Sequence, residues 1–187
     1  KDREVLVIGS GPSVSKYINE IKQYIETNKP IVLCLNINQD IPESLVDSYI
    51  ACHETRIAIE LDLYADLSKP IILPMSRIPH QISGLLSNVE ILDYGLKIEK
   101  GSLSAQDNGC ILDKPHVLIY ALSLLSRSGA QKISLTGVDG YENQSSKHKE
   151  LNKVFVKFQE NNYDINLVAI TPTNLPINTS LICEQWA

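Results

Sequence analysis

Short apolar runs alternate with amphipathic segments along the chain. The apolar runs have the length and composition of buried strands, and they cover Glu4–Ile8, Ile31–Leu35, Asp47–Cys52, Lys69–Pro74, Asn88–Gly95, Lys132–Gly137 and the segment "INLVAITP". Apolar residues spaced by three and four predict helices, which lie between Ser13 and Asn28, over Pro115–Arg127 and over Lys149–Gln159.

Strands that alternate with helices predict a parallel sheet covered on both faces. We therefore expect an α/β fold, a Rossmann-like, doubly wound and mainly parallel sheet, in a single domain over residues 1–187. The polar, aperiodic stretch Leu96–Asp113 is interpreted as a loop over the site. The chain begins at Lys1 without a methionine, which favours a domain excised from a longer protein.

Composition and charge exclude several classes of function. The net charge of −5 and the pI near 5.4 argue against a nucleic-acid partner, which needs a basic patch. The longest apolar stretch, "HVLIYALSLL", is too short for a transmembrane segment, and no signal peptide is visible, so a cytoplasmic protein is expected. The cysteines show no metal-ligand spacing, so we expect buried thiols and no metal site.

The glycine-rich turn after the first strand carries the clearest chemical signal. Its residues are Gly9, Ser10, Gly11, Pro12 and Ser13. Such a turn at the carboxyl end of a strand holds a phosphate in many doubly wound proteins; the alternative is a tight turn capped by serine. A dinucleotide fingerprint is weak because Val14 stands where a third glycine is needed, and no P-loop motif is present.

Polar residues also follow other predicted strands, at the same edge of the sheet. Asn36 can donate and accept at once, so it can bind a base, a ribose or a sugar hydroxyl; it can also serve only its own turn. Asp139 and Tyr141 follow the "KISLTG" strand, where Asp139 can bind ribose or cap the next turn.

Two further residues are candidates for substrate chemistry. Arg56, in "CHETR", can hold a phosphate or a carboxylate, or lie on the surface. His148, beside Lys147, is the candidate acid–base group, with an exposed structural histidine as the alternative. His53, His80 and His116 have no partner that the sequence reveals.

Four segments together resemble the sialyltransferases of glycosyltransferase family 42 and the related domain of motility accessory factors. They are "VLVIGSGPSV", "VLCLNIN", "ISLTGVDGYENQSS" and "INLVAITPTNLP". The resemblance implies binding of a cytidine nucleotide by Gly9, Gly11, Pro12, Ser13 and Asn36. It matches the family's G-I-D-F-Y motif to the stretch from Gly137 to Tyr141, and it implies His148 as the catalytic histidine.

The chain departs from that family at two places. The family's T-S-G before the central helix is replaced by Asp113-Lys114-Pro115. The long lid after G-I-D-F-Y, which carries phosphate-binding tyrosines, is nearly absent, and Lys147 stands at the place of the first tyrosine. The resemblance therefore implies nucleotide binding more strongly than glycosyl transfer.

The stretch "SGAQKISLTGVDGYEN" and the "GPSV" turn also look like the C-terminal part of aldolase-type proteins. Their N-terminal barrel is similar to hydroxymethylglutaryl-CoA lyase or 4-hydroxy-2-oxovalerate aldolase. That likeness implies a partner module in bacterial surface-sugar biosynthesis, joined to an N-terminal aldolase barrel that holds the metal, with no cofactor of its own. Three hypotheses follow: a nucleotide-sugar transferase, a binding module and a purely structural domain.

Overall fold

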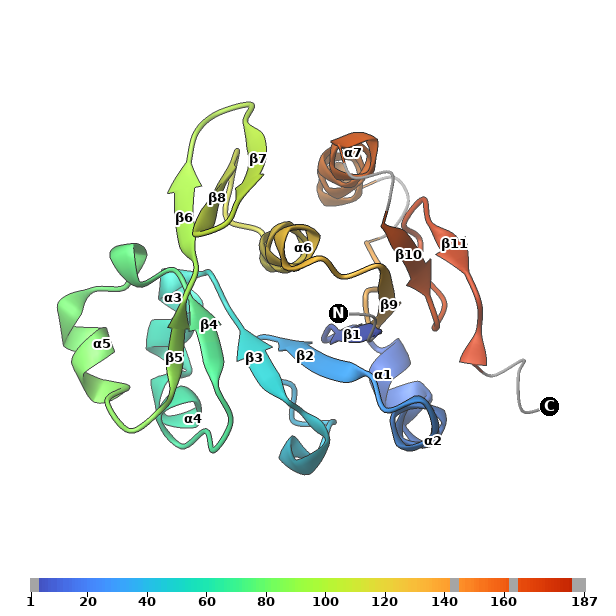
Figure 1. Cartoon of the computed structure of the whole chain (residues 1–187), viewed down its shortest axis with the longest axis horizontal. Helices are drawn as coiled ribbons and strands as arrows, with labels where there is room; N and C mark the ends of the chain where they lie inside the picture. The colour runs from blue at the N-terminus through green and yellow to red at the C-terminus, as the bar shows by residue number, and fades with distance from the viewer. Residues whose placement is uncertain (1–3, 142–144, 162–164, 183–187) are drawn as a thin grey trace.

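The computed structural model describes residues 4–141, 145–161 and 165–182. Within these residues the centre of the fold is an eight-stranded sheet, in which every neighbouring pair of strands is parallel (Figure 1). In spatial order the strands are β11 (Asn178–Thr179), β10 (Asn166–Ala169), β9 (Lys132–Thr136), β1 (Val5–Ile8), β2 (Ile31–Leu35), β3 (Ser48–Ile50), β4 (Ile71–Leu73) and β5 (Ile91–Asp93). This is the α/β, Rossmann-like arrangement that the alternating pattern predicts.

Helices lie on both faces of the sheet (Figure 1). They are α1 (Ser13–Lys16), α2 (Ile18–Asn28), α3 (Glu54–Ile59), α4 (Leu61–Ala65), α5 (His80–Leu85), α6 (Val117–Ser128) and α7 (Ser146–Asn161), with short 3₁₀ turns at Glu43–Leu45 and Met75–Arg77. α6 and α7 cover one face, and α1 and α2 cover the other (Figure 1).

The two faces bury separate cores because side chains alternate along each strand. Val5 and Val7 of β1 belong to the core beneath α6 and α7, and Leu6 and Ile8 belong to the core beneath α2. All four side chains are at most 5% exposed, so β1 is buried on both faces. A strand that is buried on both faces needs a continuous apolar run, and the sequence shows one there.

The predicted helix ends agree with the structure at two positions. Lys29 ends α2 in the left-handed conformation, and Gly129 ends α6 in the same way, each with its N–H bonded to a carbonyl of the last turn. The first predicted helix is divided in two, because Tyr17, at φ −114° and ψ 28°, leaves helical geometry between α1 and α2.

The interpretation of Leu96–Asp113 as a loop is wrong. This region forms a second sheet of β6 (Gly95–Ile98), β8 (Gly109–Leu112) and β7 (Leu103–Gln106), which packs against α6 (Figure 1). β7 and β8 are an antiparallel hairpin joined at Asp107-Asn108, before Gly109. "QDNG" is a hairpin signal, and half-buried residues alternate with exposed ones along β7.

Two expectations from composition can be compared with the structure. Cys34, Cys52 and Cys110 are free and buried, as predicted, and Cys183 lies outside the described residues. Burial raises the pKa of each of the three thiols to about 12, so they stay protonated at neutral pH. In the described part of the chain no helix has the length and apolar character that a membrane crossing requires.

Candidate functional site

The chain order changes direction between β1 and β9. From β1 the sheet grows through β2 to β5 on one side and through β9 to β11 on the other. Ligands of open parallel sheets bind beyond the carboxyl ends of the strands at such a switch point. The turns after β1, β2 and β9 meet there, and they carry most of the residues that the sequence singles out.

The glycine turn after β1 is packed directly against the turn after β9. Gly9 N–H donates to the Thr136 carbonyl, and Gly11 N–H donates to the Gly137 carbonyl, each at 2.8 Å. A Cβ on Gly9 would lie 2.2 Å from the Gly137 carbonyl oxygen. Glycine is therefore required here by the close approach of two backbones, and two amides of the turn bind the protein itself.

Asp139 holds the start of α1. Its carboxylate accepts the Ser13 backbone N–H at 2.8 Å and also accepts the Ser13 hydroxyl. Thr171 in turn accepts a hydrogen bond from the Ser13 hydroxyl at 3.2 Å, and it accepts the Gly137 N–H at the same distance. This network ties together the ends of β1, β9 and β10. It gives Asp139 a structural role at the start of α1, 126 residues away in the sequence, which differs from the cap of its own next turn that the sequence suggests as the alternative.

Asn36, directly after β2, has a different environment. Its backbone is left-handed at φ 56°, a conformation that asparagine tolerates, and its N–H donates to the Ile50 carbonyl at 2.8 Å. The residue is 4% exposed, and its side-chain Oδ1 has no hydrogen-bond partner among the described residues. Two positions later, Asn38 donates to the Gly9 carbonyl at 2.8 Å and fixes the glycine turn, a role that sequence reasoning missed.

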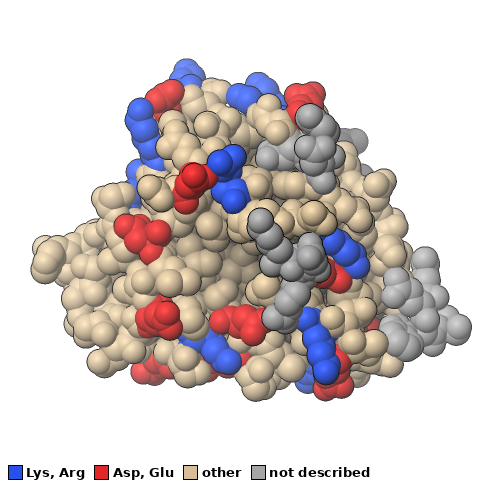
Figure 2. Space-filling model, viewed as in Figure 1, with Lys and Arg blue, Asp and Glu red and all other residues tan. Residues whose placement is uncertain are grey.

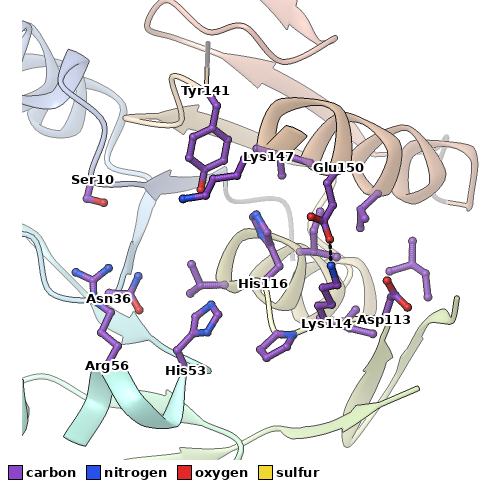
Figure 3. Close-up of a pocket in the computed structure, with 17 residues that line it drawn as sticks. Ser10, Asn36, His53, Arg56, Asp113, Lys114, His116, Tyr141, Lys147 and Glu150 are labelled. Carbon is purple, nitrogen blue, oxygen red and sulfur yellow. Dashed lines mark hydrogen bonds and ion pairs between the residues drawn. The ribbon is translucent and has the colours of Figure 1, made fainter. Parts of the chain in front are cut away.

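A cavity of about 440 Å³ opens above these strand ends, between the turn after β2, α3, α6 and α7 (Figure 3). A smaller hollow of about 280 Å³ lies over the glycine turn and the turn after β9. The two cavities share part of their walls. The residues that line both are Ser10, Asn36, His116, Val117, Tyr141 and Leu151. We treat them as one site with two compartments.

Most of the predicted site residues lie in these walls. The larger compartment is lined by Ser10, Asn36, Arg56, Tyr141 and Lys147, and the smaller one adds Gly9, Gly11, Pro12 and Asp139. Ser13 is buried beneath the turn and is not among the lining residues. Ser10 and Tyr141, which follow β1 and β9 and are 131 residues apart, thus meet as the order of the strand ends predicts, and α7 brings Lys147 to the same cavity.

His148, the predicted acid–base residue, does not line either compartment. It lies on α7, where Lys147, Glu150, Leu151 and Val154 face the cavity, and it is 7% exposed. Its Nε2 lies 2.7 Å from the Asn152 amide nitrogen one turn along the same helix. The imidazoles in the cavity wall are instead those of His53 and His116 (Figure 3).

The charged groups around the cavity are mixed. Lys114 and Glu150 form an ion pair across the cavity rim (Figure 3). Arg56 of α3 pairs with Glu60, which directly follows that helix, at 3.0 Å, and the Lys147 ammonium lies 5.9 Å from the centre of the Tyr141 ring. The face in Figure 2 shows Lys and Arg interspersed with Asp and Glu. On the face shown, the cations thus form no continuous basic patch.

Both cavity histidines are shifted toward the neutral form. Burial, followed by the charge of the neighbouring His53, lowers the pKa of His116 to about 4. Burial, followed by the charge of Arg56, also lowers the pKa of His53. The Nδ1 atom of His116 is buried without a hydrogen-bond partner among the described residues. At neutral pH the wall therefore presents uncharged imidazoles beside cationic side chains.

Comparison with known families and with curated proteins does not identify the site. No family model matches the chain, and no curated protein matches it. Among the described residues no group of three or more His, Cys, Asp or Glu side chains is arranged to hold a metal ion. The function is therefore argued from the site itself.

Proposed function

We propose that the chain is a nucleotide- or nucleotide-sugar-binding domain, similar to the sialyltransferase-type glycosyltransferases and acting in bacterial surface-sugar metabolism. The observation that carries this proposal is the buried, unpartnered Oδ1 of Asn36 in the wall of a cavity at the switch point of the sheet. An unpaired buried amide oxygen costs about 1–3 kcal/mol, which a ligand hydrogen bond offsets.

The cavity offers complementary groups for each part of such a ligand. A volume of about 440 Å³ falls in the usual range for small-molecule sites. Asn36 supplies an acceptor and a donor for a base or a sugar. Arg56 and Lys147 supply positive charge for phosphate oxygens. Tyr141 is 45% exposed at the rim, where its ring can cover a bound nucleoside.

The alternative is a non-catalytic C-terminal module of a 4-hydroxy-2-oxovalerate aldolase-like lyase. Two observations favour it. His148, the residue assigned to proton transfer, faces Asn152 rather than the cavity. The amides of Gly9 and Gly11 bind the turn after β9 and so are not available to a leaving phosphate. A module of this kind would bind its ligand without transferring a group.

The first test is a thermal-shift titration with CMP, UMP, AMP and GMP, repeated on Asn36→Gly. A ligand at a hundred times its Kd stabilises by about 2.7 kcal/mol, which raises the Tm of a chain of this size by about 5–10 °C. Asn36→Gly keeps the left-handed backbone and removes only the amide. We expect a base-specific shift in the wild type and at least about a tenfold weaker Kd in the variant.

The matched control is Lys29→Gly, which makes the same backbone change at φ 49° at the end of α2. It should leave the nucleotide shift unchanged. A flat panel in the wild type would contradict the proposal. Binding without transfer or hydrolysis of a CMP-sugar would favour the aldolase module, whereas activity that His148→Ala removes while CMP still binds would favour the transferase.

A further inference from the structure

Two imidazoles enter the cavity from the starts of two different helices. His53 precedes α3 and His116 precedes α6, each with an extended backbone at the N-cap position. Neither side chain caps its own helix with a hydrogen bond. Both rings instead turn toward the cavity, with Arg56 near His53 and Lys147 reaching in from α7 (Figure 3). The two histidines also interact electrostatically with each other.

The carboxylates near this pair already have partners. Glu150 pairs with Lys114, Glu60 with Arg56 and Glu54 with Arg77. Asp113 accepts the Gly101 N–H at 2.5 Å. The titratable and charged groups that line the site with the imidazoles are, element by element, Arg56 of α3, Asp113 and Lys114 before α6, Asp139 and Tyr141 after β9, and Lys147 and Glu150 of α7.

This arrangement resists protonation of the imidazoles while the cavity is empty of anions. Burial disfavours the charged form of each ring. In addition, the positive charge of Arg56 opposes protonation of His53, and a charge on His53 opposes protonation of His116. An oxyanion beside the two rings reverses the balance, because its negative charge favours the protonated form. The buried Nδ1 of His116 would then be one of two N–H donors on a charged ring.

We propose that His53 and His116 form a proton-coupled oxyanion subsite, in which the anionic group of the ligand binds beside Arg56 together with a proton taken from solvent. The subsite rests on the proposed function for the presence of an anionic group, a phosphate or a carboxylate, on the ligand. It adds that the affinity for this group rises as the pH falls. Neutral imidazoles leave Arg56 and Lys147 to hold the anion at higher pH.

Inorganic sulfate is the probe for the first experiment, because it keeps both charges across the working pH range and does not titrate itself. The chain has four histidines, so their ring C–H signals can be followed one by one by NMR. The pH titration is run with and without sulfate, at constant ionic strength set with chloride. We expect sulfate to raise the pKa of His53 and His116 by about one unit in total and to leave His80 unchanged.

Affinity is the second readout. A summed pKa rise of about one unit gives at most about a tenfold change in Kd over the whole titration, so sulfate should bind more tightly at pH 5.5 than at pH 6.5, by less than tenfold. His53→Asn and His116→Asn should each weaken that dependence. His80→Asn is the matched control, because His80 is exposed on α5 and does not line the cavity. The wild-type titration stands even if a cavity variant fails to fold.

Unchanged pKa values for both histidines, a pH-independent sulfate Kd, or no sulfate binding at pH 5.5 would each overturn the subsite. These results are separate from the nucleotide panel. Nucleotide binding with pH-independent sulfate binding would leave the proposed function in place and remove the subsite. Proton-coupled sulfate binding with a flat nucleotide panel would keep the subsite and overturn the proposed function.

Discussion

The two walls of the site treat their buried polar groups in opposite ways. In the wall made by the turns after β1 and β9, Gly9, Gly11 and Ser13 donate to backbone or carboxylate oxygens of the protein. In the wall made by Asn36 and His116, buried Oδ1 and Nδ1 atoms have no partner within the described residues. A satisfied group supports the architecture, whereas an unsatisfied group needs a ligand to complete it. The glycine motif thus marks the site, and its neighbours offer the binding groups.

The largest effect that this comparison predicts is at Gly9. In Gly9→Ala the new Cβ would lie 2.2 Å from the Gly137 carbonyl oxygen and 3.2 Å from Val138 Cγ2. The first of these neighbours is backbone at the centre of the sheet and cannot move aside. We expect a loss of at least about 4 kcal/mol in the free energy of unfolding, and a fall of about 10 °C or more in Tm, measured by circular dichroism.

Gly84→Ala is the control for that substitution. A Cβ on Gly84, within α5, meets no atom within 4 Å. Alanine is favoured over glycine in a helix by up to about 1 kcal/mol, so the Tm should stay or rise slightly. A Gly9→Ala protein as stable as Gly84→Ala would show that the two turns can separate, and the glycines would then need a ligand-based explanation.

The second-largest effect is expected at Asp139, whose carboxylate accepts from Ser13 and also lines the smaller compartment. Asp139→Ala leaves the Ser13 N–H and hydroxyl without their acceptor. We expect a loss of about 2–3 kcal/mol in urea unfolding, with a smaller loss in Asp139→Asn, which keeps one acceptor oxygen. If Asp139→Ala instead unfolds normally and loses nucleotide binding, the carboxylate belongs with the ligand-binding groups.

The third effect is a pH dependence of stability. The pKa of His116 is about 4 in the folded protein, well below the value of about 6.5 for an unfolded chain. The unfolded state therefore binds the proton first, and stability present above pH 6.5 is lost as the pH falls toward 4. His116 should contribute about 2 kcal/mol of that loss between pH 7.5 and 5.0.

The measurement is urea unfolding of the wild type and His116→Asn at both pH values. The variant should lose less stability on acidification, because asparagine does not titrate. His80→Asn should behave like the wild type. An identical pH dependence in the wild type and His116→Asn would place the stability loss on other groups.

Much of the site could be predicted because the order of strands decides what meets at the sheet edge. Ser10, Asn36 and Tyr141 each follow a strand closely, so their convergence needs only the parallel topology. The helical residues are harder to place, because one residue of helix rotates a side chain by about a quarter of a turn. Lys147 faces the cavity and His148 does not.

Other features depended on contacts that no local pattern encodes. The bond from Asn38 to the Gly9 carbonyl joins two turns 29 residues apart. His53 and His116 each stand at the N-cap position of a helix, where a side chain can cap the helix with a hydrogen bond. Neither does so, and both rings line the cavity instead. The small sheet of β6–β8, in contrast, does have a local signal. The stretch "QDNG" is typical of a β-hairpin, but the polar, aperiodic composition around it favours a loop.

The smallest expected effect is also the sharpest test of the comparison. Asn36→Gly removes a buried amide whose oxygen has no partner, and it keeps a backbone at φ 56° that glycine adopts freely. Loss of the side chain's packing destabilises the variant, whereas removal of a buried, unpaired amide oxygen stabilises it. These effects oppose each other, so the free energy of unfolding should change by less than about 0.5–1 kcal/mol. Urea unfolding of the ligand-free protein measures this directly.

Asn38→Gly provides the contrast, two residues away and also buried. It removes the donor to the Gly9 carbonyl and the acceptor of the Asp40 N–H, so it should cost about 2 kcal/mol. Equal losses at the two asparagines would mean that Asn36 also supports the fold, and the unsatisfied oxygen would no longer distinguish a ligand-binding wall. A loss confined to Asn38 separates the residue that holds the turn from the residue that is left for the ligand.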